Sequence, residues 1–146
     1  LSLGVNLMQA LVKAAAQVLG DNYDVEIIER HHNLKKDAPS GTALMLARSV
    51  QAVREDATLL VGRHENGKRT KQEIGIHALR MGNVVGVHEV HIVTNSQSLV
   101  LRHEAITRAM LAEGGVDAAR FICGKAAGLY NMNHLLEKCL TQRLQQ

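Results

Sequence analysis

The sequence predicts an α+β domain in which helices cover a mixed β-sheet of about four strands. Three observations support this class: the first third combines two helical patterns with a short β-branched run, the middle contains successive strand patterns, and the last third is helical again. The length of 146 residues leaves room for one domain of typical size.

A helix is expected over residues 4–19, where apolar residues recur at helical spacing and Gly20-Asp21-Asn22 follows as a stop signal. The β-branched run from Asp24 to Arg30 predicts a strand. A polar loop over residues 31–39 ends in the only proline of the chain. Ser40-Gly41-Thr42 then begins a second helix, because these residue types are favoured at helix N-termini.

The middle of the chain contains strand patterns at residues 74–78, 84–94 and 99–101. A loop over residues 62–72 precedes them, and Asn95-Ser96-Gln97 forms a plausible hairpin turn. The remaining residues predict a helix at roughly 105–124, interrupted at Gly114-Gly115, and another at about 133–145. Consecutive strands followed by helices complete the α+β pattern.

Composition excludes several classes of protein. Hydrophobic residues make up 46% and charged residues 21%, which is ordinary globular usage. Aromatic residues make up only 2%, so the bases of RNA or single-stranded DNA would have few stacking partners. The net charge of +3 is carried by scattered residues, which suits a small anion better than a nucleic acid.

No segment reaches the ~18 continuous apolar residues that a membrane span requires, so we expect no membrane partner. Cys123 and Cys139 stand apart without CxxC spacing. Two reduced thiols in a cytoplasmic protein are the simplest interpretation, with a disulfide as the alternative.

The segment Glu29–Ala43 is denser in chemically active residue types than the rest of the chain. It places two histidines and two lysines between the end of a strand and the start of a helix. The main-chain N–H groups of Gly41, Thr42 and Ala43 would point out of that helix, and together with the helix dipole they predict an anion site.

Three side chains of the same segment could act on a bound anion. Lys35 and His32 can add positive charge or hydrogen bonds. Histidine is the residue type whose ordinary pKa lies near neutral pH, which makes His31 the natural proton donor or acceptor. The segment therefore predicts a small carboxylate or phosphate ligand and chemistry that needs a proton.

Plainer interpretations remain open. Adjacent histidines can be no more than solvated loop residues, and Ser-Gly-Thr can be only a capped helix start. A metal site is not expected, because His88 and His91 lie three apart on a strand pattern and so point to opposite faces. A third possible function, that of a histidine-rich metal hydrolase, would require stoichiometric bound metal, and we expect none. No G-x-S-x-G is present and neither cysteine has a neighbouring histidine, which disfavours nucleophilic hydrolysis.

Read as E-x-H-H-x-x-K-x-D-A-P-S-G-T-A, the segment Glu29–Ala43 resembles the signature of the 4-hydroxy-tetrahydrodipicolinate reductases, the dihydrodipicolinate reductases of diaminopimelate and lysine biosynthesis. The resemblance extends over essentially the whole chain. Matching segments are Ser2–Asn6, Arg80–His88 as R-x-G-x-V-x-G-x-H, and Gly124–Met132 as G-K…G-L-Y-x-M.

This resemblance implies a fold, a reaction and an assembly. Members of the family have an N-terminal Rossmann domain that binds NADPH or NADH. Their C-terminal domain, with a fold like that of the C-terminal domain of glyceraldehyde-3-phosphate dehydrogenase, binds the substrate and forms a homotetramer. The enzyme reduces a cyclic dicarboxylate imine, with loss of water, to tetrahydrodipicolinate.

By motif position, the resemblance also assigns roles to residues. His31 matches the proton donor or acceptor of the family, and Lys35 matches its proton donor. His32 matches a substrate contact. Gly41 and Thr42 match the pair that holds a substrate carboxylate.

We expect the dinucleotide-binding domain to lie outside this chain. The sequence contains no G-x-G-x-x-G, and it begins at Leu1 rather than Met, where the family has its domain border. Residues 1–108 are expected to form the substrate-binding and oligomerisation domain, and residues 109–146 to form helices that would pack on the missing domain. Arg108 matches an arginine that supports the site, in a looser motif.

Two further expectations concern the last helices and the reaction. The outward face of the last helices should be unusually apolar, with Phe121 and Ile122 as candidates. The chain is expected to be part of an NAD(P)H-dependent reductase acting on a small dicarboxylate. The alternative is a non-catalytic module that binds anions or forms oligomers without a redox partner.

Overall fold

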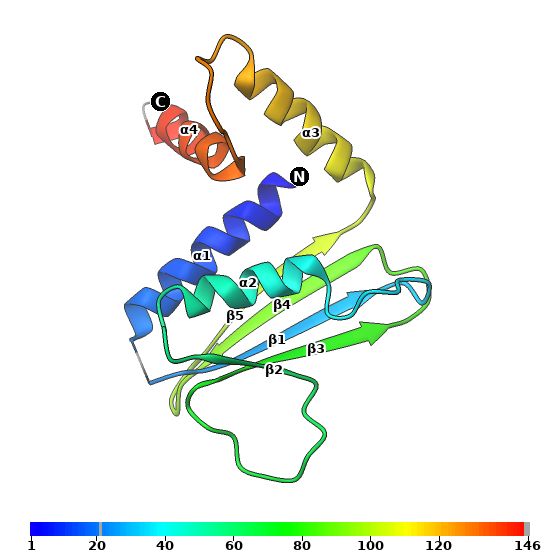
Figure 1. The fold of residues 1–146 in the computed structure, drawn as a ribbon, viewed down its shortest axis with the longest axis vertical. Helices are drawn as coiled ribbons and strands as arrows, with labels where there is room; N and C mark the ends of the chain where they lie inside the picture. The colour runs from blue at the N-terminus through cyan, green and yellow to red at the C-terminus, as the bar shows by residue number, and fades with distance from the viewer. Residues whose placement is uncertain (21, 145–146) are drawn as a thin grey trace. The chain divides into compact units, whose positions relative to one another are not determined.

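The computed structural model describes residues 1–20 and 22–144. Asp21 of the predicted stop signal and residue 145 of the predicted last helix lie outside the described residues. In chain order the elements are α1 (Leu3–Leu19), β1 (Asp24–His31), α2 (Gly41–Gln51), β2 (Thr58–Val61), β3 (Glu73–Arg80), β4 (Gly86–Val93), β5 (Ser98–Ala105), α3 (Ala109–Ile122) and α4 (Met132–Leu144) (Figure 1).

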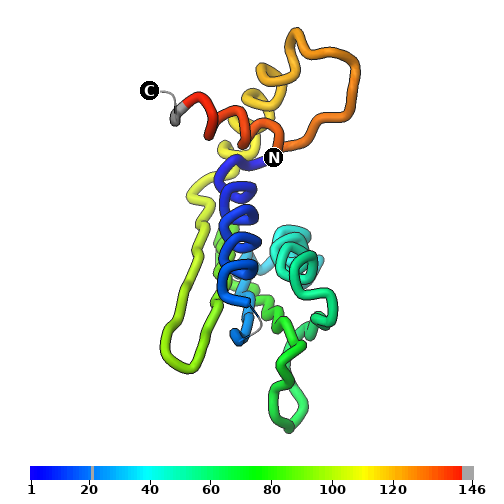
Figure 2. Tube along the Cα trace, turned by 90° about the vertical axis from the view of Figure 1, so that its left-hand side faces the viewer, coloured from blue at the N-terminus to red at the C-terminus, as the bar shows by residue number. Residues whose placement is uncertain are grey.

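The strands form one mixed sheet in the order β2-β3-β1-β4-β5. Strand β3 runs parallel to both β2 and β1, while β4 is antiparallel to β1 and to β5. This arrangement confirms the predicted α+β class and the mixed sheet. Strand β2 was not predicted, because four residues of an edge strand give too short a pattern to recognise. The loop over residues 62–72, between β2 and β3, projects away from the sheet (Figures 1 and 2).

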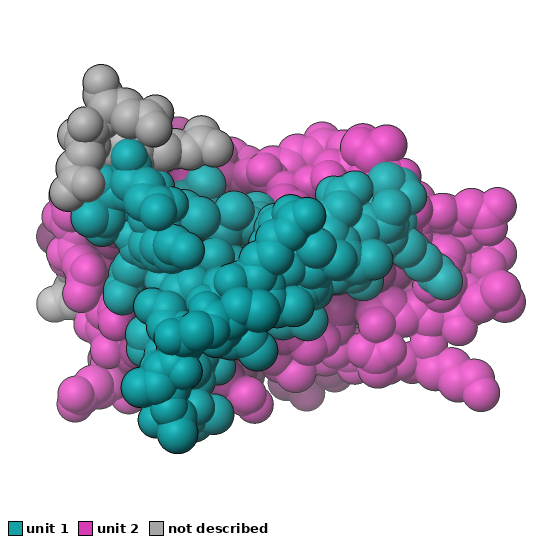
Figure 3. All heavy atoms as spheres, turned by 90° about the horizontal axis from the view of Figure 1, so that it is seen from above, with its two compact units in different colours: residues 1–7, 107–146 teal, residues 8–106 magenta. Residues whose placement is uncertain are grey.

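The chain divides into two compact units, residues 8–106 and residues 1–7 with 107–146 (Figure 3). The larger unit contains the sheet, α2 and most of α1. Its apolar core lies between these helices and one face of the sheet. Fully buried members include Val12 of α1, Leu46 of α2, Ile27 of β1, Ile76 of β3 and Val90 of β4.

The two faces of the sheet differ in character. Along β1, burial alternates so that Val25, Ile27 and Glu29 face the helices, while Glu26 and Arg30 lie on the opposite face. That opposite face is rich in ion pairs. Glu26 accepts hydrogen bonds from His77 of β3, at 2.8 Å, and from the loop residues Arg63 and Arg69, and Arg30 pairs with Glu89. Glu29, a charged carboxylate, therefore stands on the same face of the sheet as the apolar core.

The smaller unit contains α3 and α4, and it corrects the prediction of an interrupted helix. Strand β5 extends to Ala105, so the helix begins at Ala109 rather than near residue 105, and it continues through Gly114 and Gly115. A Cβ at Gly114 would lie 2.5 Å from the carbonyl oxygen of Leu1. The glycine therefore serves close packing against the start of the chain and does not end the helix.

The expectation of an outward Phe121 is wrong. Its side chain is 6% exposed and packs edge-on against Tyr130, with the ammonium groups of Lys125 and Lys138 over its ring. Ile122, in contrast, is 52% exposed. These two adjacent residues differ in exposure because neighbouring positions on a helix point about 100° apart.

Candidate functional site

The predicted site segment connects β1 to α2 and is anchored at both ends. The carboxylate of Glu29 accepts a hydrogen bond of 2.9 Å from the main-chain N–H of Ser40, eleven residues along the chain. The turn between β3 and β4 holds the middle of the segment: Met81 N donates to His31 O at 2.9 Å, and Asn33 N donates to Gly82 O at 3.1 Å. Figure 1 shows this connection beside the β3–β4 turn.

Glu29 is the centre of a buried polar cluster. Its side chain is fully buried, and Arg80 binds both carboxylate oxygens at 2.8 Å in a bidentate pair. Nδ1 of His31 lies 2.6 Å from Oε2 of the same carboxylate. Burial would raise the pKa of Glu29, but the hydrogen bonds from Arg80, His31 and Ser40 together hold that pKa below its usual value. The carboxylate is therefore ionised at neutral pH.

His31 also packs against a second histidine. Its ring meets that of His88 edge-on, with centroids 5.2 Å apart. His88 is 5% exposed, and its Nε2 lies 3.0 Å from Oγ of Ser40. Burial, reinforced by the positive charge of His31, lowers the pKa of His88 to about 4. His88 thus stays neutral at physiological pH and fixes its neighbours instead of exchanging protons.

Lys35 lies on the loop beside an acidic partner. Its ammonium group binds both oxygens of Asp37, at 2.7 and 2.8 Å, and this hydrogen bond lowers the pKa of the Asp37 carboxyl. The Lys35 side chain is 21% exposed, so its charge is close to the surface of the loop. His32 is half-buried, and its carbonyl accepts a hydrogen bond of 3.2 Å from the Lys35 N–H.

Two of the three N–H groups predicted to bind an anion are available at the start of α2, and the third is not. Ser40 is the N-cap, and its Oγ accepts from the N–H of Ala43 at 3.2 Å, so that N–H is not available to a ligand. The N–H groups of Gly41 and Thr42 belong to the first turn, where a helix has no acceptor of its own. The position of a Cβ on Gly41 is open, which leaves room for a ligand to approach the backbone.

The structure thus brings all five predicted residues onto one anchored connection. His31 stands at its start, His32 and Lys35 in the loop, and Gly41 and Thr42 at its end. No role was predicted for Glu29, Arg80 or His88, although the segments Glu29–Ala43 and Arg80–His88 contain them. The feature that reveals these roles is the register of the strands, in which Glu29 pairs with His88 and His31 pairs with Arg80.

Other kinds of site are not evident in the part of the chain that the structure describes. Within it, no group of three histidine, cysteine, aspartate or glutamate side chains is placed to hold a metal ion. Nor does any described helix combine the length and apolar character needed to cross a membrane.

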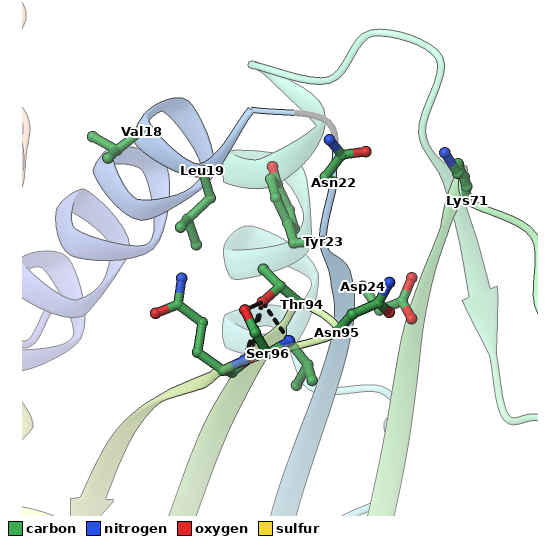
Figure 4. Close-up of a pocket in the computed structure, with 11 residues that line it drawn as sticks. Val18, Leu19, Asn22, Tyr23, Asp24, Lys71, Thr94, Asn95 and Ser96 are labelled. Atoms are coloured by element: carbon green, nitrogen blue, oxygen red, sulfur yellow. Dashed lines mark hydrogen bonds between the residues drawn. The ribbon is translucent and has the colours of Figure 1, made fainter.

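A separate pocket lies at the other end of β1, between the last turn of α1 and the β4–β5 hairpin (Figure 4). Asp24, Asn95 and Ser96 are among its lining residues, and none of the five predicted site residues lines it. The hydroxyl of Thr94 accepts hydrogen bonds from the N–H groups of Ser96 and Gln97, so the hairpin satisfies its own polar groups.

Together, the fold and the site define a class of protein: an α+β domain whose β1–α2 connection carries a helix N-terminus, a lysine and a histidine that is hydrogen-bonded to a buried carboxylate. Comparison with known proteins narrows this class. Residues 4–136 match the family model described as dihydrodipicolinate reductase, C-terminus, and the chain belongs to that family.

Similar proteins have the same reductase name. The 4-hydroxy-tetrahydrodipicolinate reductase of Clostridium novyi (strain NT) is 43% identical over 138 residues, covering 94% of this chain and 55% of the relative. That of Alkaliphilus oremlandii (strain OhILAs) is 45% identical over 137 residues, covering 93% and 57%. The chain therefore spans about half the length of the curated relatives it matches.

A solved structure supports the fold. The dipicolinate-bound dihydrodipicolinate reductase from Paenisporosarcina sp. TG-14 superposes with a TM-score of 0.62 at 27% identity. The match covers 93% of this chain and 47% of the other. That chain was solved with dipicolinate, a small dicarboxylate, as its ligand.

Proposed function

We propose that this chain is the substrate-binding part of a cytoplasmic 4-hydroxy-tetrahydrodipicolinate reductase, acting in lysine and diaminopimelate biosynthesis. The proposal is supported most directly by one observation: the family signature occupies the anchored β1–α2 connection, where a helix N-terminus, Lys35 and the Glu29–His31 pair meet on one segment. The substrate would be a small cyclic dicarboxylate.

The residues of this chain would bind and protonate that substrate. The N–H groups of Gly41 and Thr42 would hold one carboxylate, as a helix N-terminus holds anions generally. His32 would contact the substrate, and Lys35 would supply positive charge and a proton. His31 would donate or accept a proton in the reducing step.

The hydride would come from NADPH or NADH, which supplies that chemistry when bound. This chain has no glycine-rich dinucleotide fingerprint, and the cofactor would be bound mainly by a domain not present in this chain. We infer that a separate dinucleotide-binding domain holds the cofactor and that residues 109–146 pack on that domain. Arg108 would support the site. Residues 1–108 would bind the substrate and assemble as a homotetramer. The edge strand β5, with Leu99 41% and Val100 46% exposed, supports self-association.

Calorimetric titration of this chain with pyridine-2,6-dicarboxylate tests the substrate class without requiring the cofactor. Saturable binding is expected, and Lys35→Ala should weaken it about ten- to hundredfold, because a hydrogen bond to a charged group contributes about 1.5–3 kcal/mol. Lys36→Ala is the matched control: this adjacent, exposed lysine should leave the affinity unchanged. Absence of binding, or equal loss in both variants, would defeat the proposal.

The alternative, a non-catalytic anion-binding or oligomerisation module, predicts the same binding but no reaction. A protein that joins this chain to a dinucleotide-binding domain separates the two. Oxidation of NADPH that depends on 4-hydroxy-tetrahydrodipicolinate and is lost in Lys35→Ala would establish the reductase. Binding without turnover would favour the module.

A further inference from the structure

The segment Arg80–His88, which we call the cradle, contacts the site segment at each glycine and charged residue of its motif. Arg80 binds the carboxylate of Glu29 through both terminal nitrogens and also donates to Asp37 O at 2.7 Å. The carbonyl of Gly82 accepts from the N–H of Asn33. The cradle thus supports the site connection through both side-chain and main-chain hydrogen bonds.

The second half of the cradle surrounds the His31 ring. A Cβ on Gly86 would lie 3.1 Å from Nε2 of His31 and 3.4 Å from its Cδ2, closer than most real contacts. His88 meets the same ring edge-on and is linked to the N-cap Ser40. Because position 86 is a glycine, the His31 ring fits beside it without a clash, and His88 limits the rotation of that ring.

Glu29 then determines which ring nitrogen carries the proton. A carboxylate can only accept hydrogen bonds, and this one is kept ionised by Arg80 in a fully buried position. Because Oε2 is 2.6 Å from Nδ1 of His31, the proton of the neutral ring must lie on Nδ1. Nε2 is left as the nitrogen with a free electron pair.

We propose that Glu29, held by Arg80, is a positioning residue that fixes His31 in its Nδ1–H form. Gly86 leaves space beside the Nε2 edge of the same ring, and Nε2 is reserved for proton exchange with the ligand. The ligand role rests on the proposed function. The fixed form of the ring does not, because it follows from contacts within this chain.

Replacement of Glu29 by glutamine makes a directional prediction. Arg80 donates to both carboxylate oxygens of Glu29, but only Oε1 also accepts from the fixed main-chain N–H of Ser40, so the amide oxygen of glutamine would take the place of Oε1. The amide NH₂ would then face Nδ1 of His31, which must become an acceptor. The proton should therefore move to Nε2.

Long-range ¹H–¹⁵N spectra of this chain, labelled at histidine and recorded at about pH 8.5 where an ordinary histidine is neutral, report the form directly. The native chain should show His31 as Nδ1–H, and Glu29→Gln should show it as Nε2–H. Glu26→Gln is the matched control, since Glu26 accepts from His77 on the opposite face; it should alter His77 and leave His31 unchanged. An Nε2–H form of His31 in the native chain overturns the proposal, as does an unchanged form in Glu29→Gln.

If Glu29→Gln does not fold, a second variant tests the contact between the cradle and the His31 ring. Gly86→Ala should shift the ring resonances of His31 while keeping Nδ1–H, and should weaken dipicolinate binding severalfold. Gly67→Ala, where a Cβ meets nothing within 4 Å, is the control. Identical spectra for Gly86→Ala and Gly67→Ala would overturn the role of the cradle. If the native chain binds no dipicolinate while His31 is Nδ1–H, only the proposed function fails.

Discussion

The buried neutral state of His88 predicts how the stability of the chain depends on pH. The pKa of His88 is lowered from 6.5 to about 4; burial is the largest cause, the charges of His31, His103 and Lys35 act in the same direction, and Glu29 opposes them. Between these pH values the unfolded chain binds a proton at His88 that the folded chain does not, so the free energy of unfolding falls as the pH falls. A pKa difference of one corresponds to about 1.4 kcal/mol, so the lowered pKa of His88 reduces the free energy of unfolding by about 3 kcal/mol in total at acid pH.

Urea denaturation measures this effect, with His88→Gln as the perturbation. From pH 7 to about 4.5 the native chain should lose about 2 kcal/mol through His88, and this loss should be absent from His88→Gln, which has no group to protonate. His64→Gln is the matched control, because its imidazole is 81% exposed and the native pH dependence should persist. Equal losses in the native chain and in His88→Gln would refute the reasoning.

Two further predictions concern packing and capping, measured by the same denaturation at pH 7. Gly114→Ala should destabilise the chain by about 1–3 kcal/mol, because the added Cβ would lie 2.5 Å from Leu1 O, whereas Gly115→Ala, whose Cβ lies 3.8 Å from Leu1 Cδ1, should gain up to about 1 kcal/mol in helix propensity. Ser40→Ala should cost about 2 kcal/mol or more, since it removes the N-cap and the partner of His88 Nε2. Equal effects at the two glycines, or a neutral Ser40→Ala, would contradict these accounts.

Local sequence signals were sufficient for most elements. The periodic apolar residues before Gly20 and the Ser40 cap place α1 and α2 correctly, since both signals are contained in a few neighbouring residues. Strand β2 was missed because its four residues are ordered by pairing with β3, more than ten residues further along. The two glycines of α3 were misread as an interruption of the helix, because only the packing against Leu1 shows why a glycine is required at position 114.

The candidate site shows the same division. His31, Lys35 and the helix start lie on one continuous segment, so their types and spacing were enough to predict an anion site. The roles of Arg80 and His88 depend on which strands lie beside β1, and no spacing along the chain contains that register. A long-range hydrogen bond such as Glu29 to Arg80 becomes visible only once the sheet is assembled.

The hydrogen bond between Glu29 and the Ser40 N–H has a consequence for the energetics of recognition. It closes the nine-residue connection between β1 and α2 as the domain folds, together with the main-chain bonds to Met81 and Gly82. The conformational entropy of ordering these residues is therefore lost during folding and not again when a ligand arrives. A dicarboxylate that binds as proposed would meet a loop that folding has already ordered, so little conformational entropy of this loop would be lost on binding.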